Sequence, residues 1–538
     1  MRLNVNVVDY VLIALYFVTV LGIGLAARKR ISSSLDFFLA GRGLPAWVTG
    51  LAFVSANLGA IEILGMAANG AQYGAMTVHY YWIGAVPAMV FLGIVMMPFY
   101  YRSKVRSVPE FLRRRFNPAT QLLNALTFAI AQILIAGVNL YALALVMEAL
   151  LGWPLTLSVV VSAAIVLAYI TLGGLSSAIY NEVLQFFVIL AGLIPLTVVA
   201  LIKVGGVQGL ADKVRSSPLG EGGLHSWAQT TGENPMHASW IGIVFGLGFV
   251  LSFGYWTTNF AEVQRALSAR NTNAARMTPI IGAYPKLFIP LVTVIPGMIA
   301  LVLFSDLGKG SDYNNAIPML MATLLPNGVL GIAVTGLLAS FMAGMAANIS
   351  GFNTVFTNDI WRAGDDDRAV LIGRLATVAG VLLGVGTAFI AASYSNIMNY
   401  LQALFSIFNA PLFATFLLGL FWKRMSPWAG FWGLLAGTAA AVASYLAYKG
   451  GLVDFGTELN ASFWGAGLAF VVDLAVSAVI TVVTTPKPER ELRGLVYGLS
   501  DANLQDDALA GDAKWYRSPV LLGTGAVILA AALYGVIL

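Results

Sequence analysis

Residues 55–62 read Ser55-Ala56-Asn57-Leu58-Gly59-Ala60-Ile61-Glu62 and interrupt an otherwise apolar stretch of the chain. Small and polar residues at this depth favour an unwound helix, which lipid tolerates only where protein or a cavity satisfies the backbone. A second interruption reads Gly246-Leu247-Gly248, followed by Ser252-Phe253-Gly254-Tyr255-Trp256. Two interruptions at corresponding places in two halves of a chain are typical of inverted repeats with a binding site near the midplane. Glycines that only let helices pack closely are the alternative interpretation.

The composition of the 538-residue chain is that of a membrane protein, because 59% of its residues are apolar and only 10% are charged. Soluble domains carry about 25% charged residues, so a soluble enzyme, a nucleic-acid-binding protein and a disordered chain are excluded. Cysteine is absent, which excludes disulfides and thiolate catalysis. The sequence has no G-x-x-x-x-G-K-[ST] motif, so transport driven by nucleotide hydrolysis is not expected.

Hydrophobic runs of membrane-spanning length predict an all-α membrane protein with about fourteen transmembrane helices. The predicted spans are 8–28, 44–70, 79–101, 119–150, 153–173, 178–204, 238–258, 276–304, 329–358, 369–393, 397–422, 427–448, 462–484 and 518–538.

The thirty lysines and arginines predict the orientation of the chain. With the N-terminus outside, 23 of them fall in inward loops, 6 in outward loops and one, Lys286, inside a span. Inward loops usually carry the excess of positive charge. A multi-pass protein of the cytoplasmic (plasma or inner) membrane with both termini outside is therefore predicted. The longest outward loop, 205–237, has the length for a small lid, and the longest inward loop, 485–517, is too short for a catalytic domain.

Two ionisable residues inside predicted spans are candidates for function, because a charge at the bilayer centre costs about 2.5–3.5 kcal/mol. Glu62 lies in the first interruption and is expected to face a cavity, where it would bind a solute, pair with Lys286 or carry a proton. Lys286 is expected either to donate to a hydroxylated solute or a buried carboxylate, or to snorkel to the cytoplasmic interface.

Two further acids and two aromatic groups are weaker candidates. Glu182 lies at the start of a span. It is interpreted either as a first-turn acid favoured by the helix dipole or as part of a cation relay on the cytoplasmic side. Asp473 lies midway along a late span, where an interhelical role is expected. The stretch Tyr80-Tyr81-Trp82 and the pair Tyr255-Trp256 are typical of membrane interfaces, but Tyr255-Trp256 adjoins the second interruption, where a flat ring can stack on a solute.

Several runs, taken in order, resemble the sodium/solute symporter family, and within it the sodium–sugar cotransporter branch. The resemblance covers about residues 36–499. Its runs are Phe38-Leu39-Ala40-Gly41-Arg42, Ser107-Val108-Pro109-Glu110-Phe111 with Arg114-Arg115-Phe116, Leu172-Gly173-Gly174-Leu175-Ser176 with Val183-Leu184-Gln185, Tyr255-Trp256 with Gln264-Arg265, Pro285-Lys286-Leu287, Phe356-Thr357 with Asp359-Ile360, and 416–424. The resemblance implies one transmembrane domain over 1–538 with a LeuT-type fold. In that fold two inverted five-helix repeats, 44–204 and 238–422, follow an extra N-terminal helix at 8–28 and precede C-terminal helices at 427–538.

The resemblance also implies a sugar site. The positions that match the family's site, or stand in it with a changed residue, are Asn57, Glu62, Tyr80, Tyr81, Tyr255, Trp256, Lys286 and Gln402. Three positions depart from the sugar transporters. Glu62 stands where they often have glutamine or histidine, Tyr81 replaces a sugar-binding glutamate, and Gly84 replaces a small hydroxyl residue.

The cation site implied by the resemblance differs more strongly from the family's pattern than the sugar site does. Backbone carbonyls would come from Ser55, Leu58 and Ser340, but the two hydroxyl positions are Ala343 and Gly344, which have no side-chain oxygen. Hard cations prefer oxygen ligands, so sodium coupling is expected to be weakened or absent. Proton coupling through Glu62 or Glu182, or uniport, would then replace it.

The predicted function is secondary active import of a small polar solute, with a monosaccharide such as glucose or galactose as the first choice and Na⁺ or H⁺ as the driving ion. A same-fold transporter of an organic acid, a nucleoside or a polyol, or a sodium-independent sugar uniporter, is the alternative. No cofactor, no metal beyond Na⁺, no nucleic acid and no obligate protein partner are expected; the partners are the solute and the lipid bilayer. Three other classes are not expected. The sequence shows no signalling domain for a sensor and no continuous polar pore for a channel. It shows no catalytic cluster for an enzyme, and its three histidines are His79, His225 and His237.

Overall fold

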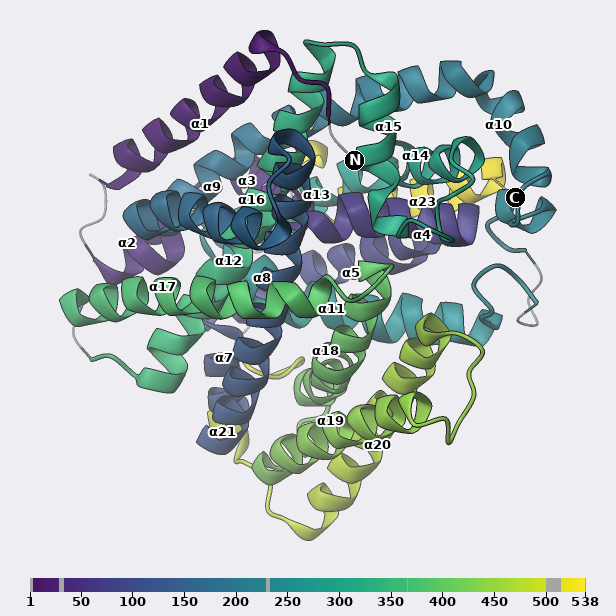
Figure 1. The fold of residues 1–538 in the computed structure, drawn as a ribbon. Coiled ribbons are helices and arrows are strands. Elements are labelled where there is room, and N and C mark those ends of the chain that lie inside the picture. Colours follow the sequence, from purple (N-terminus) through teal and green to yellow (C-terminus); the bar gives the residue numbers. More distant parts are fainter. Residues whose placement is uncertain (1–2, 29–32, 229–232, 365, 500–513, 538) are drawn as a thin grey trace.

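The computed structural model of the chain is built of helices and describes residues 3–28, 33–228, 233–364, 366–499 and 514–537 (Figure 1). Over these ranges, ten helices are long and apolar enough to cross a membrane, or up to twelve if each of two bent pairs is one span. Leu155–Ala168 and Pro519–Gly535 are shorter apolar helices. Extended structure in the same ranges is limited to two isolated β-bridges. The all-α architecture is confirmed, and the count of fourteen spans stays a prediction.

Most of the predicted spans coincide with helices to within a few residues. The matching pairs are 8–28 with α1 (Val7–Arg28), 79–101 with Tyr80–Arg102, 119–150 with α8 (Pro118–Leu151), 276–304 with α13 (Thr272–Phe288) and α14 (Pro290–Leu303), 329–358 with α16 (Val329–Val355), 369–393 with α17 (Asp366–Ala391), 397–422 with α18 (Ile397–Phe421), 427–448 with α19 (Pro427–Lys449), 462–484 with α20 (Glu458–Val483), and 518–538 with α23 (Pro519–Ile537).

The first interruption breaks a helix where the sequence predicts it. Helix α3 (Ala46–Asn57) ends at the break, and the chain resumes as Ile61–Val78 at an angle of 57°. Leu58 leaves the helical conformation with φ −71° and ψ 41°. The glycine and the polar side chains of this segment therefore mark a true break within an apolar span.

The second break lies further along the chain than the sequence predicts. Gly242–Thr258 is helical throughout, and the bend of 50° falls at Asn259, before α12 (Phe260–Leu267). Gly246 lies within this helix, and its lack of a side chain lets α20 pack closely against it. A β-carbon there would lie 2.7 Å from the carbonyl oxygen of Phe463. The packing interpretation of this glycine is thus the correct one. Asn259 caps α12 by accepting a hydrogen bond from Ala261 N at 3.1 Å.

The predicted spans 153–173 and 178–204 form one helical run, α9 (Leu155–Val204), with a kink at Gly174. Gly174 has a φ of +55°, a conformation that side chains other than glycine seldom adopt. A β-carbon at this position would also lie 2.9 Å from the ring of Phe37. The two predicted spans are therefore joined by a kink at one glycine and not by a short loop.

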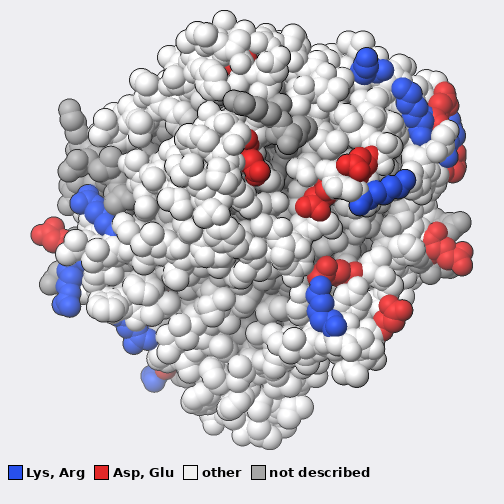
Figure 2. Space-filling model, in the orientation of Figure 1, with Lys and Arg blue, Asp and Glu red and all other residues white. Residues whose placement is uncertain are grey.

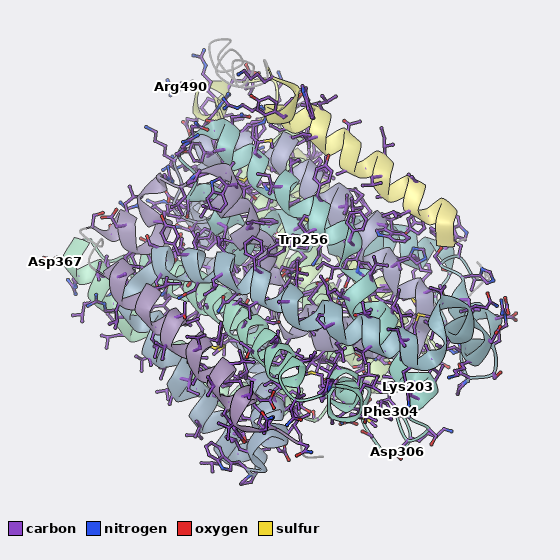
Figure 3. The ribbon with its side chains drawn as sticks, turned by 90° about the horizontal axis from the view of Figure 1, so that it is seen from above. Lys203, Trp256, Phe304, Asp306, Asp367 and Arg490 are labelled. Carbon is purple, nitrogen blue, oxygen red and sulfur yellow. The ribbon has the colours of Figure 1, made fainter. Side chains whose placement is uncertain are left out.

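The two sets of predicted loops lie at opposite ends of the molecule. In Figure 3, Asp367 and Arg490 from predicted inward loops lie far from Lys203, Phe304 and Asp306 at the predicted outward end. Trp256 lies between them, in the middle of the bundle. Most of the face seen in Figure 2 is uncharged, as expected of a surface in contact with lipid. Residues 29–30 of the positive cluster 28–30, 229–232 of the outward loop and 500–513 of the inward loop lie outside the described residues.

Helices α18, α19 and α20 pack together beside the broken helices (Figure 1). Within this group the hydroxyl of Thr415 donates to Asp473 Oδ2 at 2.7 Å, and Ser477 donates to Oδ1 at 2.9 Å. The interhelical role predicted for Asp473 is confirmed by the bond from α18.

Candidate functional site

A small closed cavity lies beside the first break, and it is lined by all eight residues that the sequence predicts to bind a solute. Its volume is about 50 Å³. The eight come from six parts of the fold: α3, the segment after the break, the π-helical turn Tyr80–Ala85, α11 (Ser252–Thr258), α13 and α18. They are Asn57, Glu62, Tyr80, Tyr81, Tyr255, Trp256, Lys286 and Gln402. Their convergence is a finding, and their role in binding stays a prediction.

Lys286 forms a buried ion pair with Glu62. Its Nζ lies 2.7 Å from Glu62 Oε2, and the two side chains are only 2% and 3% exposed. Nζ also donates to Asn57 Oδ1, and it lies 5.1 Å from the ring centroid of Trp256 and 5.5 Å from that of Tyr81. The snorkelling interpretation of Lys286 is therefore wrong, because the amine points into the protein and not to the interface. The pairing of Glu62 with Lys286 is confirmed.

A chain of hydrogen bonds leads from this pair to a carboxylate that sequence reasoning missed. Asn57 Nδ2 donates to the hydroxyl of Tyr255 at 3.0 Å, and that hydroxyl donates to Glu262 Oε1 at 3.0 Å. Glu262 is buried, and its Oε2 has no partner among the described residues. The signal that could have found it is the spacing Asn259-x-x-Glu262, a helix N-cap followed by an acid at the third position.

Two acceptor oxygens in the cavity are buried and have no partner among the described side chains and backbone groups. They are Glu62 Oε1 and Gln402 Oε1. A buried acceptor without a hydrogen bond costs about 1–3 kcal/mol. A solute that brings hydroxyl donors to these two oxygens would recover that free energy. The faces of Trp256 and Tyr81 supply apolar contact beside them.

The cavity is closed to solvent in this structure, because every side chain that lines it is at least nine-tenths buried or nearly so. Its 50 Å³ has room for roughly three to five waters, at about 10–15 Å³ each. A hexose needs more room than this, so its binding requires the walls to move apart.

Comparison with known proteins places the chain in a family. The sequence profile described as "Sodium:solute symporter family" matches residues 37–437, most of the chain. The chain belongs to the sodium:solute symporter family. The sodium/glucose cotransporter 1 of Oryctolagus cuniculus is 27% identical over 96% of this chain and 85% of that protein. A sodium/mannose cotransporter of Bos taurus is 31% identical over 81% of this chain and 78% of that protein.

A solved structure shows the same fold. A Na⁺-coupled sialic acid symporter in a substrate-bound, outward-open state matches 89% of this chain and 99% of its own with a TM-score of 0.73, at 19% identity. The predicted family and the LeuT-like architecture are thus confirmed, and this symporter is a multi-pass membrane protein. The family and the two relatives are transporters, not enzymes.

Two of the residues predicted to bind a cation, Leu58 and Ser340, are hydrogen-bonded to each other. The carbonyl of Leu58 accepts a hydrogen bond from the hydroxyl of Ser340. The neighbouring N–H of Ala60 donates to Asn139 Oδ1 at 3.0 Å. Sequence reasoning missed Asn139, one of four buried amides on α8 with Gln121, Asn124 and Gln132, because its partner lies on another helix. Ser55, Ala343 and Gly344 lie at or beside this place, and their predicted role in cation binding stays a prediction.

Glu182 does not reach the cavity. It is fully buried against Arg265 of α12, whose Nε donates to Oε2 at 3.2 Å and whose NH2 group donates to Oε1. Of the two carboxylates predicted as a proton relay, only Glu62 lines the cavity. The relay role itself stays a prediction for both.

The outward loop forms one wall of a wide vestibule of about 970 Å³. The loop contributes Pro218 through Gly222 and His225, and the opposite wall has Gln72, Tyr73 and Tyr313. The loop also carries a short helix, α10 (Gly206–Arg215). It therefore lies where the predicted lid would act, and lid movement stays a prediction.

Proposed function

We propose that this symporter imports a neutral monosaccharide of the glucose or galactose class and binds it in the cavity beside the first break. The observation that carries the proposal is the buried pair of Lys286 and Glu62, which places donors and acceptors in the cavity without net charge. The names of the relatives, a glucose and a mannose cotransporter, support a sugar as the solute.

The ion pair argues against an organic acid. An anionic solute would have to draw Lys286 away from Glu62 or lie within reach of that carboxylate. Breaking a buried pair costs about 3–5 kcal/mol, which binding of a single carboxylate does not return. A sugar keeps the pair intact, donates hydroxyls to Glu62 Oε1 and Gln402 Oε1, and accepts from the amine.

The aromatic residues support a ring-shaped solute. Trp256 packs on Phe53 at 5.6 Å between ring centroids, and Tyr255 packs on Phe405 at 4.8 Å. These contacts hold the rings that line the cavity in fixed orientations. An aliphatic C–H face of a pyranose would lie against such a surface.

Transport by alternating access is part of the proposal. In it, 44–204 and 238–422 are the two inverted five-helix repeats, with 8–28 before them and 427–538 after, in about fourteen spans of the cytoplasmic membrane with both termini outside. The bends of 57° and 50° support this arrangement, because each breaks the first helix of one proposed repeat. The closed cavity is then an occluded state between outward and inward access.

The driving ion is proposed to be Na⁺, as in the family, or H⁺ with Glu62 as the acceptor; without either, the protein is a uniporter. Glu62 is preferred to Glu182 because it lines the cavity and retains an oxygen without a partner.

Uptake into proteoliposomes tests the proposal. Labelled sugars, a polyol, a nucleoside and an organic acid are compared under separate Na⁺ and H⁺ gradients. Accumulation of a hexose above the other solutes is the expected result, and preference for the organic acid would overturn the sugar assignment. Sodium-driven accumulation that is indifferent to pH would exclude proton coupling.

A further inference from the structure

The first break exposes backbone groups inside the bundle, and its neighbours satisfy them. Helix unwinding frees the Leu58 carbonyl and the Ala60 N–H. The hydroxyl of Ser340 on α16 donates to the carbonyl, and Asn139 Oδ1 on α8 accepts from the N–H at 3.0 Å. Both sides of the break are thus held by side chains of the protein.

The amide of Asn139 fits between two glycines. A β-carbon at Gly59 would lie 2.6 Å from Asn139 Oδ1, and one at Gly344 would lie 2.5 Å from the same oxygen. The two glycines also face each other, since a β-carbon on Gly344 would lie 3.0 Å from the Cα of Gly59. Asn139 is 1% exposed. Its carboxamide therefore fills the space between the break and α16.

The two positions that the family resemblance expects to give a sodium ion side-chain hydroxyls at this place give none. Hard cations prefer oxygen ligands, and Ala343 and Gly344 have none in their side chains. The Leu58 carbonyl already uses one of its two lone pairs to accept from Ser340. With no oxygen at positions 343 and 344 and the Asn139 amide in the space, the residues fit the amide better than a bound ion.

We propose that Asn139 takes the place of a sodium ion at the first break. Its amide joins the break to α8 and α16, so the broken helix adopts its solute-binding conformation without sodium at this position. Asn57 and Glu62, on either side of the break, are held in the cavity by the same arrangement. The inference rests on the proposed function only where it speaks of solute, and its first test needs no solute.

The first test measures thermal unfolding of the purified full-length protein in detergent with sodium alone as the probe, against choline as the replacement cation. A ligand that binds only the folded state raises Tm. Wild type is expected to show little or no sodium-dependent rise. The triple variant N139G/A343S/G344S introduces two hydroxyls and removes the amide from between the two glycines, while the β-carbon at position 344 keeps its 3.0 Å approach to Gly59 Cα. A larger sodium-dependent rise in Tm is expected than for wild type.

Two more variants keep the test decisive. A343S alone is the matched control, with wild-type behaviour expected because Asn139 still fills the space. N139A is expected to unfold at lower temperature in both salts, because Ala60 N–H loses its acceptor. A sodium-dependent rise in wild type that equals or exceeds that of the triple variant would overturn the proposal. If N139A abolished such a rise, Asn139 would be a ligand of the ion instead of its replacement.

The second test uses sugar binding, and it separates this inference from the proposed function. Wild-type affinity for the sugar found in the uptake panel is expected to be the same in sodium and choline. N139A is expected to bind it about tenfold more weakly, equivalent to about 1.4 kcal/mol, in both salts. Unchanged affinity in N139A would overturn the role of Asn139. If no sugar binds to wild type, the proposed function fails while the unfolding test still decides the inference.

Discussion

Lys286 Nζ lies 2.7 Å from Glu62 Oε2 and joins α13 to the segment that follows the first break. The contact links a helix of the second proposed repeat to the broken helix of the first. Both side chains are buried, so each satisfies a charge that the protein interior would otherwise leave unpaired.

Removing one partner is expected to destabilise the protein. Lys286→Ala leaves Glu62 charged or forces it to take up a proton, and the expected loss is about 3–5 kcal/mol of unfolding free energy. The same variant is expected to raise the apparent substrate constant. Thermal unfolding and the concentration dependence of uptake measure the two effects.

Two other variants test whether the loss belongs to the pair. Lys286→Met with Glu62→Gln removes both charges and is expected to regain most of the stability but not the affinity. Lys423→Ala is the control, because its pair with Glu489 is exposed and such pairs contribute about 0–1 kcal/mol. Equal losses for Lys286→Ala and Lys423→Ala would show that the buried pair has no special role.

Gln402→Ala is expected to weaken solute binding without loss of stability. The Oε1 of Gln402 has no partner among the described residues, so its removal costs the folded protein little. The solute loses one hydrogen bond, about 0.5–1.5 kcal/mol, and the apparent substrate constant rises by roughly two- to tenfold. Uptake kinetics measure this, with Gln208→Ala on the exposed helix α10 as the matched control. An unchanged constant would place the pocket elsewhere.

Tyr255→Phe is expected to disturb both ends of a hydrogen-bond chain. The hydroxyl accepts from Asn57 and donates to Glu262, so its loss leaves two buried polar groups without partners, at about 1–3 kcal/mol each. A lower Tm and a lower uptake rate are expected. Tyr100→Phe is the control, because that buried hydroxyl donates to the Thr257 carbonyl and Tyr100 is not among the described residues that line the cavity. If the two variants behaved alike, the chain would have no part in transport.

The helices and the first break could be predicted from the sequence because their signals are local. An apolar run of about 20 residues has few solutions in lipid, and Gly59 beside Asn57 and Glu62 marks unwinding directly. The position of the second break was predicted wrongly because a glycine in a span can mark either an unwound helix or close helix packing. Gly246 serves close packing against α20, which depends on a helix more than 200 residues away.

The site could be predicted in part for the same reason. Intramembrane charge and aromatic pattern pointed to Glu62, Lys286 and the aromatic residues one by one, and the family resemblance added Gln402 and gathered all eight into one site. Asn139 was missed because it is one of four buried amides on α8, and its partner is fixed only by tertiary packing. Glu262 follows the helix N-cap Asn259, but that motif does not show that its carboxylate contacts Tyr255. The contacts of the two residues can be recognised only in the structure, where α8 lies against the break and α12 lies against Tyr255.

His79 is expected to hold the outward loop and the last helix against the cavity. Its Nε2 lies 2.6 Å from the carbonyl oxygen of Ser226 and its Nδ1 lies 2.7 Å from the hydroxyl of Tyr534. A carbonyl only accepts, so Nε2 carries the proton and Nδ1 accepts from the tyrosine. His79 directly precedes the turn that carries Tyr80 and Tyr81. The outward loop, α23 and this turn are therefore all joined at His79.

His79→Ala is therefore expected to speed hydrogen exchange in loop residues 219–228 and in α23, and to raise the apparent substrate constant. Tyr534→Phe removes only the link to α23, so faster exchange is expected in that helix while the loop keeps its protection. His225→Ala is the matched control, since that histidine lies 3.4 Å from the surface acid Glu221 and makes no hydrogen bond to α23 or to the turn at Tyr80 among the described residues. Hydrogen exchange followed by mass spectrometry resolves the two regions. Unaltered exchange of the loop in His79→Ala would mean that other contacts hold the loop and that His79 is not the point of attachment.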